Sequence, residues 1–540
     1  MSIFQVPFDI SLLKPSELID KKGDYIDIWK QESLDDTYLM EYFFETPAYN
    51  ELCKTKKYIV SGRKGTGKTA LRRAFTDKFG RLEDYYIHDL EVQDLFTPTF
   101  FNNLQEKINN DPKEVYKSYI DIIGWMVCLQ WVQVLLKNDF YIHDDFHKSV
   151  LPDNYRILLE TILKLNGYVD LGDIGVQSLT LKKVKTTNEF LTSIGYGGFS
   201  GSIKKGAENE YEIIEIDFFQ IKPYIENFIV DLMNKSGKIF YMLFDGLDKV
   251  RTIAGNPELY NKIITDFLLA IFAFNTKMIN KLGNSSRMII FIRNDILDLL
   301  EGDYDDMGKL RGDYRVEINW QEDYLEENSL LNQMIEKRIA KGIEIRNNHK
   351  IKKLYTKPLF KNALITSKIM NKYIIRPPTY LQDDFGKFDI QKFLYNKTLL
   401  RPRDYVSFFG LFSKSTSIEG FEKDYSNYFK SQTLDEIKKI VKDYSVTEKA
   451  LEQTCRGTGK FSGEEFIKNY IADRTENTKL IREANDTLRL LYENGVIGYI
   501  DKNSFGNTRT RFYYREVDTR AFNPTNCILH SGLYKAYGVI

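Results

Sequence analysis

The sequence has only four cysteines, and their spacing matches no zinc site. Free thiols in a reducing compartment are therefore the expectation. The first residues also lack the basic region and the apolar core of a signal peptide, so we expect a cytoplasmic protein. The cysteines are Cys53, Cys128, Cys455 and Cys527.

The chain also lacks an excess of charge of either sign and an uninterrupted apolar run of membrane-spanning length. Lysine and arginine total 76, as do aspartate and glutamate. This balance argues against a protein dedicated to coating nucleic acid or a membrane surface, although it leaves room for a local basic patch. The longest apolar stretch, residues 119–136, is interrupted by Asp121, Gln130 and Gln133, and it predicts a buried helix.

What the chain does contain is a glycine-rich stretch between an apolar run and a helix-forming run. Residues 62–69 match the phosphate-binding pattern G-x-x-x-x-G-K-[ST]. Its glycines permit turns that point backbone N–H groups at a phosphate, and the following helix adds its positive end. Lys68 is predicted to reach the β- and γ-phosphates and Thr69 to ligate Mg²⁺. The predicted nucleotide-binding residues are Gly62, Arg63, Lys64, Gly65, Thr66, Gly67, Lys68, Thr69 and Ala70.

A second stretch, residues 238–248, is a nearly continuous apolar run that ends in acids. Such a run is typical of a strand buried on both faces of a parallel sheet. The strand that holds Mg²⁺ in a P-loop NTPase ends in an acid, so Asp245 is predicted to bind the metal. Asp248 lies just beyond and is predicted to reach an attacking water. No guanine-selecting Asn-Lys-x-Asp motif is present, so ATP and Mg²⁺ are the expected cofactors.

Residues 286–295 repeat the pattern of an apolar strand followed by polar residues. Ligands of open α/β sheets lie at the carboxyl ends of the strands, so Arg293 is predicted to point toward the γ-phosphate. The alternative is a surface arginine at a strand end. Residues 85–88 and 315–320 predict two further strands of the same core.

A region of about residues 90–236 separates these motifs. It is helical at first and then richer in glycine, threonine and lysine. Apolar and polar side chains alternate over residues 179–185, and residues 195–201 form a glycine-rich turn. Together they predict a projecting β-hairpin. Its lysines fit a solvated edge better than a phosphate-contacting arm. They are Lys182, Lys183, Lys185, Lys204 and Lys205.

The last 220 residues predict a helical lid, a polar linker at 413–431 and a compact terminal domain. Pro402 suits the first turn of a helix. Its neighbours Arg401 and Arg403 could reach phosphates or could pair with nearby acids. Three helices followed by a two-stranded ribbon, at 496–500 and 509–515, describe a winged helix. Its near-zero net charge favours an intramolecular or protein–protein role over DNA reading.

Together these motifs resemble the AAA+/STAND branch of P-loop ATPases. Residues 244–248 are similar to the Walker B motif of NACHT proteins, although Lys249 stands where a further acid usually follows. Residues 291–295 resemble the family's sensor motif, which places Arg293 on the sensor arginine. Residues 527–533 resemble the Met-His-Asp motif, which implies that His530 contacts a bound ADP.

The chain departs from this family next to Asp245, where Gly246 replaces the usual catalytic acid. Either Asp248 orients the water or hydrolysis is slow. The motif set as a whole resembles bacterial ATPases that are often linked to antiviral defence. That resemblance implies a homo-oligomer, a protein effector as partner, or both.

The predicted fold class is α/β, with a P-loop NTPase parallel-sheet core of the AAA+/STAND type, an inserted helical and β-hairpin region, a helical lid and a C-terminal winged helix. The predicted function is an ATP-hydrolysing conformational switch. The alternatives are a DNA-remodelling ATPase and a scaffold that binds ATP without turnover. Predicted domains are residues 1–50, a lead-in; 51–320, the core with its insertion at about 90–236; 321–430, the lid and linker; and 431–540, the winged helix.

Overall fold

A computed structural model of the chain divides into two compact units. The first, here called the sheet unit, comprises Pro47–Arg63 and Leu71–Ile318. The second, here called the C-terminal unit, comprises Met1–Thr46, Lys64–Ala70 and Asn319–Ile540. The structure describes residues 8–9, 18, 26–31, 36–98, 100–101, 119–137, 141–144, 147–150, 156, 159–160, 162, 178–182, 213–255, 257–301, 312–320, 329–350, 375–376, 390–415, 417–438, 441, 443–472, 474, 478–502, 508–515 and 522–539.

The sheet unit is built on five parallel strands in the order β10-β2-β9-β8-β3. This confirms the predicted α/β class with a parallel sheet. Every residue of β2 and β9 is buried, as expected for strands covered on both faces. The strands are β2 (Ile59–Gly62), β3 (Tyr85–Glu91), β8 (Ile239–Asp245), β9 (Arg287–Arg293) and β10 (Arg315–Glu317).

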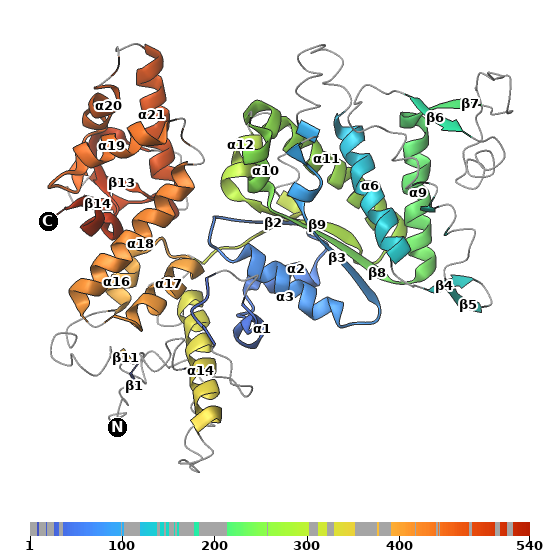
Figure 1. Ribbon diagram of the computed structural model, residues 1–540, viewed down its shortest axis with the longest axis horizontal. Helices are drawn as coiled ribbons and strands as arrows, with labels where there is room; N and C mark the ends of the chain where they lie inside the picture. The colour runs from blue at the N-terminus through green and yellow to red at the C-terminus, as the bar shows by residue number, and fades with distance from the viewer. Residues whose placement is uncertain are drawn as a thin grey trace. The chain divides into compact units, whose positions relative to one another are not determined.

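Helices cover both faces of this sheet (Figure 1). Successive residues of β8 point to opposite faces, so Tyr241 and Phe244, three positions apart, lie on different faces. Tyr241 packs its ring against Phe75 of α3 at a centroid distance of 5.0 Å. Phe244 packs against Phe267 of α11 at 5.2 Å on the other face. The helices of this unit are α2 (Pro47–Lys54), α3 (Lys68–Gly80, entering from the loop), α6 (Tyr119–Lys137), α9 (Phe218–Ser236), α10 (Leu247–Ala254), α11 (Pro257–Leu282) and α12 (Asn294–Glu301).

Two of these helices are apolar enough, by length and composition, to cross a membrane. They cover Ile120–Lys137 in α6 and Glu258–Leu282 in α11, and most of each is buried inside the protein. Trp131 of α6 lies edge-on to Phe240 of β8. Packing against the sheet therefore accounts for their apolar character, as predicted for residues 119–136.

The inserted region contributes two antiparallel strand pairs. The predicted strand at 179–185 is β6 (Ser178–Lys182), and it pairs with β7 (Ile213–Asp217). The predicted turn at 195–201 and the four lysines beyond Lys182 lie outside the described residues. A second pair, not predicted, joins β4 (Tyr141–Asp144) to β5 (His147–Val150).

The C-terminal unit is mainly helical. The polar linker predicted at 413–431 is wrong, because α18 spans most of it. Phe421, Tyr425 and Phe429 recur every four residues along α18 and are buried, so the polar residues between them cover the exposed face. The helices are α1 (Leu39–Tyr42), α14 (Leu330–Lys350), α16 (Ile390–Lys397), α17 (Pro402–Phe412), α18 (Ile418–Lys438), α19 (Tyr444–Cys455), α20 (Gly463–Ile471) and α21 (Thr478–Glu493).

A small antiparallel sheet completes this unit. The predicted ribbon is present, because Tyr499 of β13 pairs with Arg511 of β14. Two further strands extend it to the order β12-β15-β13-β14. A separate parallel pair joins β1 (Phe8–Asp9) to β11 (Ile375–Arg376). The strands of the small sheet are β12 (Lys460–Phe461), β13 (Ile497–Lys502), β14 (Thr508–Arg511) and β15 (Cys527–Leu529).

Candidate functional site

The carboxyl ends of the parallel strands bring three predicted residues to one edge of the sheet. Arg293, the last residue of β9, lies in register with Gly62 at the end of β2. Asp245, the last residue of β8, lies in register with Glu91 at the end of β3. Because β9 runs between β2 and β8, Arg293 stands between the strand that enters the glycine-rich loop and the strand that ends at Asp245. Asp248 follows in the first turn of α10.

Asp245 is held in place by a buried cation that the sequence analysis did not single out. Arg72 Nη1 of α3 lies 3.1 Å from Asp245 Oδ2, and the backbone N–H of Gly246 donates to Oδ1 at 2.8 Å. A carboxylate oxygen has two lone pairs, so each can still accept a water or a metal ion. Oxygen donors of this kind suit Mg²⁺, which needs only one or two protein carboxylates beside phosphates and waters.

Arg72 joins Asp245 to two further carboxylates of β3. Its Nη1 donates to Glu91 Oε1 at 2.7 Å, and its Nε lies 2.6 Å from Asp89 Oδ1 without hydrogen-bond geometry, as an ion pair. Burial alone would lower the pKa of Arg72, but the three carboxylates outweigh it and raise the pKa. Burial raises the pKa of Asp89. The guanidinium thus ties α3 to the ends of two strands.

The predicted sensor residue, Arg293, is mostly buried at the sheet edge. It donates to Asp295 through Nε at 2.9 Å and Nη2 at 2.7 Å. Its Nη1 lies 3.8 Å from Asp248 Oδ2. The structure therefore brings Arg293 and Asp248 close together and adds Asp295 as the group that orients the guanidinium.

The glycine-rich loop adopts the backbone conformations that its glycines allow. Gly65 and Gly67 have φ values of +81° and +91°, in the left-handed region. Gly62 instead ends β2. Lys68 and Thr69 begin α3, as predicted, and are half-buried. That Lys68 and Thr69 lie close to Asp245 stays a prediction.

Three consecutive carbonyl groups of this loop accept hydrogen bonds from other residues of the C-terminal unit, to which the loop belongs. Arg401 Nη1 donates to Lys64 O at 3.3 Å, and the backbone N–H of Arg403 donates to Gly65 O at 3.4 Å. Trp320 Nε1 donates to Thr66 O at 2.8 Å. We call these three donors the carbonyl clamp. In a planar trans peptide the C=O and the next N–H point in opposite directions. The clamp therefore directs the N–H groups of the three following residues, 65–67, away from its donors.

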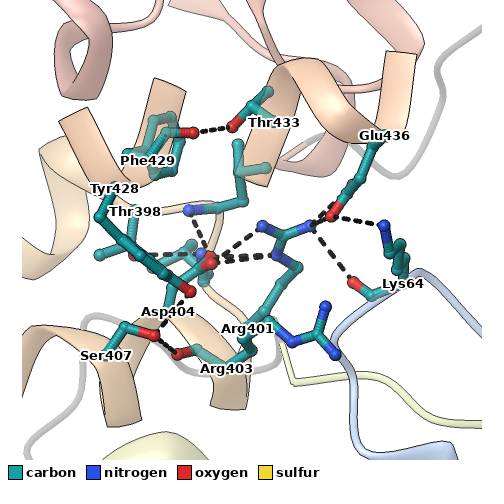
Figure 2. Close-up of polar contacts among 12 residues, drawn as sticks. Lys64, Thr398, Arg401, Arg403, Asp404, Ser407, Tyr428, Phe429, Thr433 and Glu436 are labelled. Atoms are coloured by element: carbon teal, nitrogen blue, oxygen red, sulfur yellow. Dashed lines mark hydrogen bonds and ion pairs between the residues drawn. The ribbon is translucent and has the colours of Figure 1, made fainter. Parts of the chain in front are cut away.

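Arg401 is the centre of a buried ionic cluster (Figure 2). It donates from Nη2 to Asp404 Oδ1 at 2.9 Å and from Nη1 to Glu436 Oε2 at 3.1 Å. Lys64 Nζ lies 3.8 Å from Glu436 Oε1. The two carboxylates outweigh burial and raise the pKa of Arg401. Of the two roles left open for Arg401, pairing with acids is the one observed, and the same side chain also binds the loop.

Leu400, next to Arg401, has a φ of +54° although it is not glycine. This conformation costs about 1–3 kcal/mol and persists only where neighbouring contacts enforce it. Here the Thr398 hydroxyl accepts from the Leu400 N–H at 3.1 Å, and Asp404 Oδ2 accepts from the Leu399 N–H at 2.9 Å. The strained residue, Leu400, directly precedes Arg401, which donates a hydrogen bond to the loop.

His530 is fully buried, and both of its ring nitrogens have protein partners. The backbone N–H of Gly532 donates to Nδ1 at 3.1 Å, and Nε2 lies 2.8 Å from the Tyr514 hydroxyl. The ring stacks on Phe429. Burial lowers its pKa well below the ordinary value, so the ring is neutral. This geometry does not support the predicted contact with ADP, and it gives His530 a structural role.

No protein-family model matches the chain, and no curated protein is significantly similar to it. Within the part of the chain that the structure describes, no three His, Cys, Asp or Glu side chains are grouped as metal ligands. The site residues that sequence reasoning missed are Arg72, Glu91 and Trp320. Glu91 had a usable signal, because it is an acid at the carboxyl end of a strand of the core.

Proposed function

We propose that this protein is an ATP-binding and ATP-hydrolysing molecular switch. The observation that carries the proposal is the loop between β2 and α3, where glycines are left-handed and the carbonyl clamp leaves three consecutive N–H groups pointing away from its donors. Oriented N–H groups at a helix N-terminus are what binds phosphate in proteins. The edge of the same sheet supplies a carboxylate, Asp245, and a cation, Arg293.

Four of the predicted residues have a physical role in this proposal. Lys68 neutralises charge on the β- and γ-phosphates, and Arg293 responds to the presence of the γ-phosphate. Thr69 and Asp245 would hold Mg²⁺, whose chemistry is to neutralise charge that develops on the phosphate oxygens. Asp295 keeps the Arg293 guanidinium oriented, so little reorganisation is needed when a nucleotide arrives.

The carbonyl clamp supports the switch part of the proposal. A loop that closes on a nucleotide moves its peptide groups, and these peptides are bonded to Arg401 and Trp320 of the C-terminal unit, to which the loop itself belongs. Nucleotide binding can therefore bias that unit between two arrangements. We propose that α19–α21 with β13 and β14 form a winged helix that takes part in this change. Use in bacterial antiviral defence, in the cytoplasm and with a protein effector or self-association, follows from the family resemblance.

The test of this function is phosphate release. We expect Mg²⁺-dependent release by the wild type and a fall of at least about 100-fold in Lys68→Ala and in Asp245→Asn, because each removes transition-state charge stabilisation. Exposed residues on helices of the sheet unit give matched controls. Lys281 and Asp231 form an ion pair on the surface, and each control removes one of its two charges. Lys281→Ala and Asp231→Asn should therefore keep the wild-type rate. Equal rates in all five proteins would contradict the proposal.

A further inference from the structure

The residue after Asp245 has no side chain, yet the space beside it is occupied. A Cβ atom built on Gly246 would lie 2.5 Å from Glu91 Oε2, closer than two unbonded atoms approach. Gly246 also has a φ of +83°. The absence of a side chain at position 246 thus leaves room for a carboxylate that comes from the neighbouring strand.

Glu91 reaches this place because of strand register. It is the last residue of β3, and it lies opposite Asp245 in the parallel pair of β3 and β8. The pairing fixes the two α-carbons on adjacent strands at the same sheet edge. The Glu91 side chain retains 22 % of its exposure, so water can reach the carboxylate.

Two cations from separate helices fix the Glu91 carboxylate. Arg72 of α3 donates to Oε1 at 2.7 Å, and Lys249 of α10 donates to Oε2 at 2.9 Å. Although burial alone would raise the pKa of Glu91, the hydrogen bonds from Lys249 and Arg72 outweigh it and lower the pKa. The group is therefore an ionised acceptor with lone pairs left for a water molecule.

Asp248, the other candidate acid, is placed differently. It lies in the first turn of α10, more than a third of its side chain is exposed, and its Oδ2 is 3.8 Å from Arg293 Nη1. It thus faces the cation at the end of β9, on the opposite side of β8 from Glu91. Asp248 does not fill the space beside Asp245.

We propose that Glu91 is the catalytic carboxylate that orients the attacking water, in place of an acid at position 246. This role rests on the proposed ATP hydrolysis. The water donates a hydrogen bond to Glu91 while its oxygen bonds to the γ-phosphorus. The bond from that phosphorus to the bridging oxygen breaks, ADP leaves with the electron pair, and the water protons depart with inorganic phosphate.

The experiment compares Glu91→Gln with Asp84→Asn, which alters an exposed carboxylate that directly precedes the same strand and pairs with Lys238. Phosphate release and binding of a fluorescent, non-hydrolysable ATP analogue are measured for each. We expect Glu91→Gln to lower kcat by about 100-fold or more, within the range of general acid–base contributions. Its affinity for the analogue should change less than about threefold. Asp84→Asn should keep both quantities within about threefold of the wild type.

Other outcomes overturn the assignment. The assignment is wrong if Glu91→Gln releases phosphate at a rate within threefold of the wild type. It is also wrong if Asp248→Asn loses phosphate release while Glu91→Gln keeps it. If Glu91→Gln fails to fold, Glu91→Asp replaces it. That variant keeps the charge and withdraws the carboxylate by one methylene, so an unchanged rate overturns the proposal and a fall of at least tenfold supports it. A wild type that does not bind the analogue contradicts the proposed function itself, whereas normal binding with no effect at Glu91 contradicts only this inference.

Discussion

Charged residues that are buried in this protein have structural roles that exposed charged residues lack. Arg401 is fully buried and shares its guanidinium between Asp404 and Glu436, while it also binds a loop carbonyl. Such a cluster costs desolvation energy, so its net contribution to stability is modest. Removing only the guanidinium is different, because the buried Asp404 then loses the cation that it pairs with and the buried Glu436 keeps only the longer contact with Lys64.

Replacing Arg401 by methionine therefore has a large predicted effect. We expect Arg401→Met to lower the free energy of unfolding by about 3–5 kcal/mol, measured by urea denaturation. Arg489→Met is the matched control, because Arg489 pairs with Glu493 on an exposed helix face and has 70 % of its side chain exposed. The control should change stability by no more than about 0.5 kcal/mol. Similar losses in both variants would contradict a buried role for Arg401.

The places of single residues were predictable where chemistry restricts which amino acids a position can hold. Gly65 and Gly67 have the positive φ angles that the motif predicts, and Arg293 reaches the expected sheet edge. The role of Arg401 could not be decided from the sequence, because only one of its acids, Asp404, lies close along the chain. The other, Glu436, is 35 positions away and is brought to Arg401 by packing. His530 shows the same limit. A short motif placed it near a nucleotide, whereas its neighbours Tyr514 and Phe429 bury it.

At the scale of elements, the core strands were predictable because continuous apolar runs leave few alternatives. The predicted strands at 85–88, 238–248, 286–295 and 315–320 all correspond to strands of the sheet. Strand order was not predictable, since it depends on pairings between distant segments. The polar segment after residue 413 was misread, because an amphipathic helix with one buried aromatic stripe resembles a linker in composition.

The carbonyl clamp gives a prediction about the loop as an element. Trp320→Phe removes the indole N–H that binds Thr66 O while it keeps an aromatic ring in a buried position. A hydrogen bond of this kind contributes about 0.5–1.5 kcal/mol, so ATP affinity should fall about two- to tenfold in isothermal titration. Trp29→Phe, which alters a tryptophan stacked on Phe409, should leave affinity unchanged. An unchanged Kd in Trp320→Phe would mean that the loop holds its shape without this donor.

At the scale of the whole molecule, the division into two units follows a change in sequence composition at one boundary and has no such sign at another. A seven-residue stretch, Lys64–Ala70, groups with the C-terminal unit although it follows β2 directly. The change of unit between Ile318 and Asn319 falls beside the predicted end of the core at residue 320. The sequence indicates such a boundary through its change in composition, but it contains no local sign that a loop belongs with residues hundreds of positions away.

A nucleotide-driven switch should be visible in the sedimentation of the intact protein. We expect different sedimentation coefficients with ADP and with a non-hydrolysable ATP analogue, since the two ligands differ in the γ-phosphate that Arg293 is proposed to detect. Lys68→Ala should sediment identically with both ligands. Identical behaviour of the wild type with both nucleotides, at concentrations that saturate the site, would argue against a switch and favour a static scaffold.

The distance along the chain between the loop and its clamp has a consequence for protein synthesis. Lys64 and Arg401 are 337 positions apart, and Thr66 and Trp320 are 254 apart. At about 5–20 residues per second, the ribosome needs about 17–70 s to make the segment between Lys64 and Arg401. Until then the nascent chain carries its glycine-rich loop without these donors. The loop acquires its final shape late in translation, so a partly made chain lacks the loop conformation on which the proposed nucleotide binding depends.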